Sequence, residues 1–190
     1  MKPISNTTPI SSTPERKLTA TREVLLPGGS DHALRELLHD LFTIGTRLEE
    51  IRRHLGSCMG LSGPQFSLLM AIQELQGQEG VSVGRLARYL HVAGTFVTAE
   101  SAKLARKDYI ERRTAARDRR VTLLCVRPAG AKAIERLIPE VQAVNDTFFA
   151  MESGQSFDGL CRAADRMVEG TERVLSLIQQ DQDRVRIVGA

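Results

Sequence analysis

Apolar side chains recur every three or four residues along most of the chain, which is the spacing of one face of an α-helix. The first such stretch runs from Leu34 and stops at Gly56. A second follows residues 62–65 (SGPQ), which have capping-box spacing and a proline in the first turn, and it ends near Gly77. The pattern therefore predicts a long helix followed by a shorter one.

Two further amphipathic stretches lie close together. Residues 83–90 form the first, which Ser82 is placed to cap, and residues 95–107 form the second. A tight turn, His91 to Gly94, separates them. Two helices joined in this way predict a helix-turn-helix.

The pattern changes from helical to strand-like after the second of these helices. Residues 109–112 and 120–126 are rich in β-formers, and the polar residues 113–119 lie between them. This arrangement predicts a β-hairpin with arginines at its tip. Beyond Pro128, which suits the first turn of a helix, the helical spacing returns twice and predicts a fifth and a sixth helix.

Composition agrees with a mainly helical fold, because Trp is absent, aromatic residues make up 4% of the chain, and Leu, Ala, Arg and Glu are abundant. We predict a mainly α protein of the α+β winged-helix type, with six helices and one hairpin. Residues 1–30 hold four of the seven prolines and end in PGGS, which predicts a flexible N-terminal arm. The folded domain is expected at 31–180, with its helix-turn-helix region at 81–127 and a C-terminal tail at 181–190.

Positive charge is concentrated in the middle third of the chain. Residues 85–120 carry ten basic and four acidic side chains, a net charge of +6, whereas the whole chain has a net charge of +3. A merely solvated surface would mix the two signs more evenly. A basic helix-turn-helix followed by a basic hairpin matches the DNA polyanion, with a helix for the major groove and an arm for the minor groove.

Helical geometry indicates which side chains of residues 95–107 would face DNA. If Val97, Ser101 and Leu104 face the core, the opposite face points outward. Threonines on that face suit base edges and basic residues suit phosphate. In the hairpin, Asp118 is expected to brace the tip by an ion pair while an arginine enters the minor groove. The residues predicted to meet DNA are Thr95, Thr98, Ala99, Lys103, Arg106, Arg113, Arg117, Asp118, Arg119 and Arg120.

Residues 86–134 resemble the winged-helix core of the MarR family of bacterial transcription regulators. The shared features are Leu86-Ala87, Val97-Thr98, Leu104, Ile110-Glu111-Arg112, Asp118-Arg119-Arg120 and Gly130, and their spacing agrees. The order of elements extends the likeness to residues 32–180. The resemblance implies a homodimer in which residues 31–77 and 128–180 supply intertwined dimerisation and ligand helices. It also implies that the two recognition helices read a pseudo-palindrome with half-sites about one helical turn apart.

Three positions depart from the family pattern. Ala99 stands where many relatives carry a basic residue, Asp108 replaces the usual glycine after the recognition helix, and Arg127-Pro128 interrupts the familiar Leu-Thr. These departures concern the operator sequence more than the fold.

Members of the family commonly repress transcription and release DNA when a small molecule binds between the dimer helices and the winged helix. The resemblance implies such an effector here, and we expect an aromatic carboxylate or phenol, because cationic or hydrogen-bonding groups beside aromatic walls suit a flat anion. No cofactor is expected. The residues predicted to line the effector site are His39, Phe42, Arg47, Met59, Phe66 and Met70, with Phe148 as a further candidate.

Other functions are weighed against this interpretation. A redox-responsive regulator would depend on Cys58, which lies after the first long helix, and a dimeric helical scaffold that binds protein would explain the helices but not the +6 region. The four histidines form no tight ligand set, and the chain lacks a phosphate-binding glycine motif and a nucleophile elbow, so neither a metal site nor an enzyme is expected.

The cysteines and the hydropathy bear on location. The three cysteines are far apart and form no CxxC pair, and no run of about 18 apolar residues or signal-peptide core occurs. We expect a cytoplasmic protein.

Overall fold

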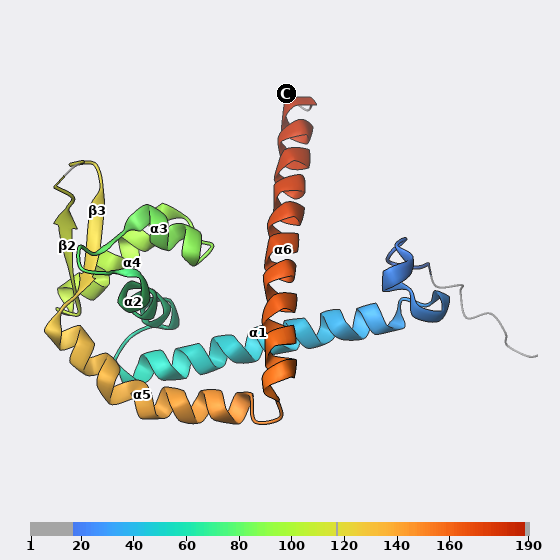
Figure 1. Cartoon of the computed structure of the whole chain (residues 1–190). Coiled ribbons are helices and arrows are strands. Elements are labelled where there is room, and N and C mark those ends of the chain that lie inside the picture. The colour runs from blue at the N-terminus through green and yellow to red at the C-terminus, as the bar shows by residue number, and fades with distance from the viewer. Residues whose placement is uncertain (1–16, 117, 189–190) are drawn as a thin grey trace, which may run out of the picture. The chain divides into compact units, whose positions relative to one another are not determined.

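The computed structural model describes residues 17–116 and 118–188, and it contains the six predicted α-helices and the predicted hairpin (Figure 1). The helices begin and end within a few residues of the positions that the apolar pattern predicts, with one exception at the C-terminal end. The helices are α1 (His32–Cys58), α2 (Gly63–Leu75), α3 (Val83–Tyr89), α4 (Gly94–Arg106), α5 (Pro128–Phe148) and α6 (Gly154–Val188).

A small antiparallel sheet accompanies the helices, with strands β1 (Val81–Ser82), β2 (Ile110–Thr114) and β3 (Thr122–Val126) in the order β1-β3-β2. In the hairpin, Ile110 pairs with Val126 and Thr114 pairs with Thr122, so the residues between them form the tip. Strand β1 was not predicted, because it is too short for a period of two to be visible. It adds a third strand beside β3.

Helix α2 is the centre of the core, because it packs against α1, α3, α4 and β3. Leu68, Leu69 and Ile72 on α2 are fully buried. Each such side chain contributes about 1.5–3 kcal/mol when it leaves water. Leu86 of α3, Val97 and Leu104 of α4, and Leu124 of β3 are likewise fully buried in the same compact unit. The helix-turn-helix and the hairpin are therefore built around α2.

Local signals place the ends of these helices. Ser62 and Gln65 form the predicted capping box at the start of α2, and the Ser82 hydroxyl accepts a hydrogen bond from the backbone N–H of Arg85 at the start of α3. Gly130, in the first turn of α5, lies so close to the start of the hairpin that a Cβ there would be 2.2 Å from the carbonyl oxygen of Tyr109. Only glycine fits that contact.

The segment before α1 has local structure that the sequence analysis did not predict. Two short 3-10 helices occupy Glu23–Leu25 and Pro27–Gly29. The backbone N–H and hydroxyl of Thr19 donate to Oδ2 of Asp31, at 2.9 and 2.7 Å, and Asp31 is 2% exposed. These hydrogen bonds lower the pKa of Asp31. Part of the predicted arm, from residue 17, is thus folded back on the start of α1, while residues 1–16 lie outside the described residues.

The chain divides into two compact units, Met1–Leu137 and Ile138–Ala190. In the second unit, the rings of Phe148, Phe149 and Phe157 pack edge to face, with centroids 4.5 and 5.4 Å apart. Helix α6 continues to Val188, so the tail expected at 181–190 is helical over most of its length.

No single helix in the described part of the chain is long and apolar enough to cross a membrane. Helices α1 and α2 meet that criterion only as a pair, and the pair is bent by 79°.

Candidate nucleic-acid interface

Helix α4 has one buried and one exposed face, as predicted. Val97, Ser101 and Leu104 are fully buried. The residues of the outer face that are predicted to meet DNA are threonines, an alanine and two basic residues. Those residues, Thr95, Thr98, Ala99, Lys103 and Arg106, are all exposed.

The two threonines at the start of α4 differ in what they can offer. The Thr98 hydroxyl donates to the carbonyl oxygen of Gly94 at 2.9 Å, which leaves its oxygen lone pairs to accept a hydrogen bond. Thr95 lies in the first turn, where backbone N–H groups and the helix dipole favour an anion. The start of α4 thus offers a hydrogen-bond acceptor, the Thr98 oxygen, together with backbone N–H groups that favour a phosphate.

Lys103 is held by a carboxylate on its own helix. Its Nζ lies 2.6 Å from Oε1 of Glu100, and the other carboxylate oxygen of Glu100 accepts a hydrogen bond from Nε2 of Gln65 at 3.2 Å. Glu100 is only 9% exposed, and the hydrogen bond from Lys103, aided by that from Gln65, holds its pKa below its usual range. No structural role for Glu100 was predicted from the sequence. Its spacing of three residues from Lys103 was the available signal.

The C-terminal end of α4 is tied to the turn between α1 and α2. Nζ of Lys107 donates to the carbonyl oxygen of Gly60 at 2.9 Å, and the Tyr109 hydroxyl donates to that of Met59 at 3.2 Å. Asp108 has a φ of 62° and forms an ion pair with Arg127 at 3.0 Å. Asp tolerates this left-handed conformation better than most residues, which explains how it can occupy a position where the resemblance implies glycine.

In the hairpin stem, Arg113 is directed toward its own strands. Its Nε lies 2.7 Å from Oε1 of Glu111, and its Nη2 donates to Sγ of the buried Cys125. The same arginine lines a surface cavity of about 440 Å³ between the α2–β1 turn and the hairpin. Arg113 was predicted to meet DNA, and in this structure its guanidinium is engaged within the protein.

The hairpin tip is braced by an ion pair, as predicted, and the partner of Asp118 is Arg120. Oδ1 of Asp118 accepts from the backbone N–H of Arg120 at 2.9 Å and from its Nε at 3.2 Å, and Oδ2 accepts from its Nη2 at 3.3 Å. The side-chain hydrogen bond from Arg120 lowers the pKa of Asp118. Arg119 is exposed, and Arg117 lies outside the described residues.

The residues predicted for an effector site fall into separate groups. His39, Phe42 and Arg47 are exposed on α1, with Phe42 75% exposed. Met59 and Phe66 are each 8% exposed and belong to the core, and Met70 is half-buried. A depression on α1 is lined by His39 together with Arg35, Glu36 and Asp40, and by none of the other predicted residues. Phe148 is exposed and belongs to the second compact unit.

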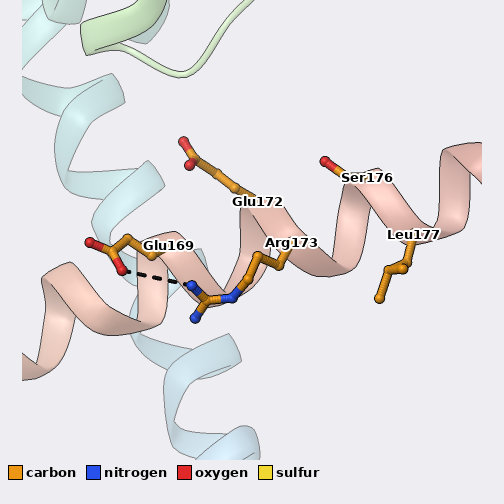
Figure 2. Close-up of a pocket in the computed structure, with 5 residues that line it drawn as sticks. All are labelled: Glu169, Glu172, Arg173, Ser176 and Leu177. Carbon is orange, nitrogen blue, oxygen red and sulfur yellow. Dashed lines mark ion pairs between the residues drawn. The ribbon is translucent and has the colours of Figure 1, made fainter.

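A further depression follows the surface of α6, where Glu169 and Arg173 form an ion pair at 3.8 Å (Figure 2). Its other lining residues are Glu172, Ser176 and Leu177, so every wall comes from one helix. Side chains of a single helix surface do not enclose a ligand.

The cysteines and histidines are the remaining candidates for redox chemistry or metal binding. Cys58 is exposed, with Sγ 3.9 Å from Nε2 of His54, whereas Cys125 is buried. Over residues 17–116 and 118–188, no group of three or more His, Cys, Asp or Glu residues is arranged to hold a metal ion.

Comparison with known proteins gives a family match over the winged helix. The sequence model of the MarR family matches residues 59–121, which include α2, α3, α4 and β2. No curated protein matches the chain in sequence.

Solved structures share the fold at low sequence identity. A MarR transcriptional regulator from Methanosarcina mazei is 18% identical, with a TM-score of 0.58, and the match covers 73% of this chain and 99% of that one. MepR from S. aureus, in a complex with DNA, is 18% identical with a TM-score of 0.61, covering 68% and 92%. A mutant MarR from E. coli, complexed with operator DNA, is 18% identical with a TM-score of 0.59, covering 72% and 94%.

These likenesses show the fold, and the family match covers α4, β2 and the hairpin tip but not β3. Both agree with the motifs of residues 86–134. The chain therefore has the winged helix-turn-helix fold of these structures, and its residues 59–121 are similar to the MarR family.

Proposed function

We propose that the protein is a DNA-binding transcriptional regulator that places α4 in a major groove and the β2–β3 hairpin beside a minor groove. The observation that carries the proposal is the exposed basic and polar face of α4, next to a basic hairpin, on a helix whose other face is buried in the core. Arg106 is exposed on α4 and suited to phosphate, and Arg119 is exposed at the hairpin tip. Two solved relatives of the same fold are complexed with DNA, which supports the proposal.

The acting form in this proposal is a homodimer. Helix α1 exposes a set of large apolar side chains, which are Leu37, Leu38, Leu41, Phe42, Ile44 and Leu48. Apolar surface of this extent marks an interface.

Helix α6 carries a second exposed stripe. Its positions follow alternating steps of three and four residues, the pattern of a coiled-coil seam. A second copy of the chain is the partner that presents the same seam, and it would cover both sets of side chains. The stripe comprises Phe157, Leu160, Ala164, Met167, Thr171, Val174 and Ile178.

Dimerisation determines the kind of DNA site that the protein matches. A dimer carries two α4 helices, and a two-fold protein matches a pseudo-palindromic site whose half-sites are about one helical turn apart. The protein acts as a repressor in this account, occupying such a site near a promoter.

We further propose that binding of a small aromatic acid or phenol releases the protein from DNA. The family resemblance supports this proposal. His39 and Arg47 are exposed donors on α1, and Phe42 is an exposed aromatic residue on the same helix. A site built from them needs further walls, which a partner protomer would supply. Isothermal titration of the dimer with aromatic acids measures this directly, and an absence of heat across the series counts against it.

DNA binding is tested by fluorescence anisotropy with a duplex from upstream of the protein's own gene and a scrambled duplex of equal length, at several salt concentrations. The proposal predicts a steep salt dependence and a preference for the native duplex on the order of a thousandfold near physiological salt. Equal and salt-steep binding to both duplexes would indicate a sequence-independent DNA-coating protein. No binding even at low salt would favour a helical scaffold for protein partners.

A further inference from the structure

Glu100 is a buried carboxylate on α4, the helix that carries residues predicted to meet DNA. Its side chain is 11% exposed, whereas that of its ion-pair partner Lys103 is 47% exposed. A carboxylate this close to a DNA-facing surface repels phosphate, so it needs a physical explanation.

Both oxygens of Glu100 are fixed by different partners. Oε1 lies 2.6 Å from Nζ of Lys103, and Oε2 accepts from Nε2 of Gln65 at 3.2 Å. Gln65 is in turn fixed, because its Oε1 accepts from the backbone N–H of Ser62 and its own N–H donates to the Ser62 hydroxyl. The capping box of α2 therefore positions Gln65, and Gln65 positions the carboxylate of Glu100.

We propose that Glu100, anchored by Gln65, competes with DNA phosphate for Lys103 and so determines how much sequence-independent affinity α4 contributes. The inference rests on the proposed DNA-binding function. A lysine whose charge is matched at 2.6 Å neutralises little of a phosphate's charge, so it releases few counterions. Specificity then depends more on the threonines at the start of α4 and on the hairpin than on Lys103.

Arg106 provides the comparison within the same helix. It is exposed one turn after Lys103, and no ion pair joins it to another residue in the described ranges. Arg106 and Lys103 thus share a helix face and a sign of charge, and they differ in whether a carboxylate holds them.

The experiment measures the slope of log Kobs against log salt concentration on the scrambled duplex for the full-length protein. Glu100→Gln keeps the side chain's size and removes its charge, so the slope should steepen by about 0.9, the value of one added phosphate contact. Adding Lys103→Met to that variant should remove the gain. Glu74→Gln, which removes an exposed carboxylate from α2, is the matched control and should leave the slope unchanged.

Single lysine and arginine variants complete the test without altering Glu100. Arg106→Met should flatten the slope by about 0.9, and Lys103→Met by less than half as much. Equal losses for the two variants, or an unchanged slope for E100Q, would overturn the inference while leaving DNA binding intact. If neither the wild type nor any variant binds with a salt dependence, the proposed function fails and the inference fails with it.

Discussion

At the scale of single residues, the interface depends on contacts that do not face DNA. Gly130 lets the first turn of α5 approach the start of the hairpin, and Glu100 ties α4 to the cap of α2. Neither residue belongs to the outer face of α4. Both determine where that face is held.

Gly130→Ala should destabilise the protein by about 1–3 kcal/mol, because the added methyl group would overlap the backbone oxygen of Tyr109, 2.2 Å from the Cβ position. Chemical denaturation at fixed protein concentration measures the change. Gly84→Ala is the control, since a Cβ there has only the end of the Arg88 side chain within 4 Å, at 3.9 Å. That variant should be neutral or more stable, by up to about 1 kcal/mol.

The pH dependence of the free energy of unfolding should reveal the ionisation of Glu100. Its pKa is lowered in the folded protein, so the charged carboxylate stabilises the fold above its ordinary pKa of 4.5, and this stabilisation is lost as the pH falls through the lowered value. E100Q should be less stable than wild type by about 1 kcal/mol at pH 7. The difference should shrink below pH 4.5. A difference that stays constant from pH 7 to pH 3 would contradict the assigned ion pair.

At the scale of elements, the arginines of the hairpin differ in whether other side chains of the protein engage them. Arg113 is engaged by Glu111 and Cys125, and Arg120 is engaged by Asp118, whereas Arg119 is exposed. Arg119 is therefore the described tip arginine that we expect to approach the minor groove.

Arg119→Ala should weaken binding to native and scrambled duplexes alike and flatten the salt slope by about 1. Arg136→Ala removes the same charge from an exposed position on α5, outside the predicted interface, and should change neither quantity. Anisotropy titrations of both variants decide the matter. Equal effects of the two substitutions would mean that only net charge acts.

Charges introduced into the exposed stripe of α6 should disrupt the dimer, whereas the same charges elsewhere on α6 should not. Val174→Glu with Ile178→Glu places two carboxylates in the stripe and should convert a dimer to a monomer, as measured by sedimentation velocity. Ser176→Glu with Gln180→Glu adds the same charge on the same helix outside the stripe and should leave the dimer intact. A dimer that survives the first pair would place the interface elsewhere.

The elements were largely predictable from sequence, while their side-chain partners were not. Apolar spacing and the caps at Ser62 and Ser82 predict the helices, since these signals are local. The bond between Gln65 and Glu100 joins residues 35 positions apart, and no local pattern reveals it. The engagement of Arg113 by Cys125 is equally tertiary. Met59 and Phe66 are apolar, as residues that line an effector site would be. Apolar residues also form the core, and both of these residues are buried in it.

At the scale of the whole molecule, charge and apolar surface are divided between different parts of the chain. The +6 region comprises residues 85–120, whereas the exposed apolar sets lie on α1, in the same compact unit, and on α6, in the unit Ile138–Ala190. This division suits a regulator in which some helices join two copies while the winged helices hold DNA. It also separates the residues that set oligomeric state from those that set affinity.

The central claim is that a dimer of this chain recognises a specific duplex. The most direct test is sedimentation velocity of the protein with a labelled duplex from upstream of its own gene, in the presence of excess scrambled duplex near physiological salt. The account predicts a single complex of two chains per labelled duplex that survives a competitor excess on the order of a hundredfold. Loss of the labelled complex to the scrambled competitor, or a complex with one chain per duplex, would contradict it.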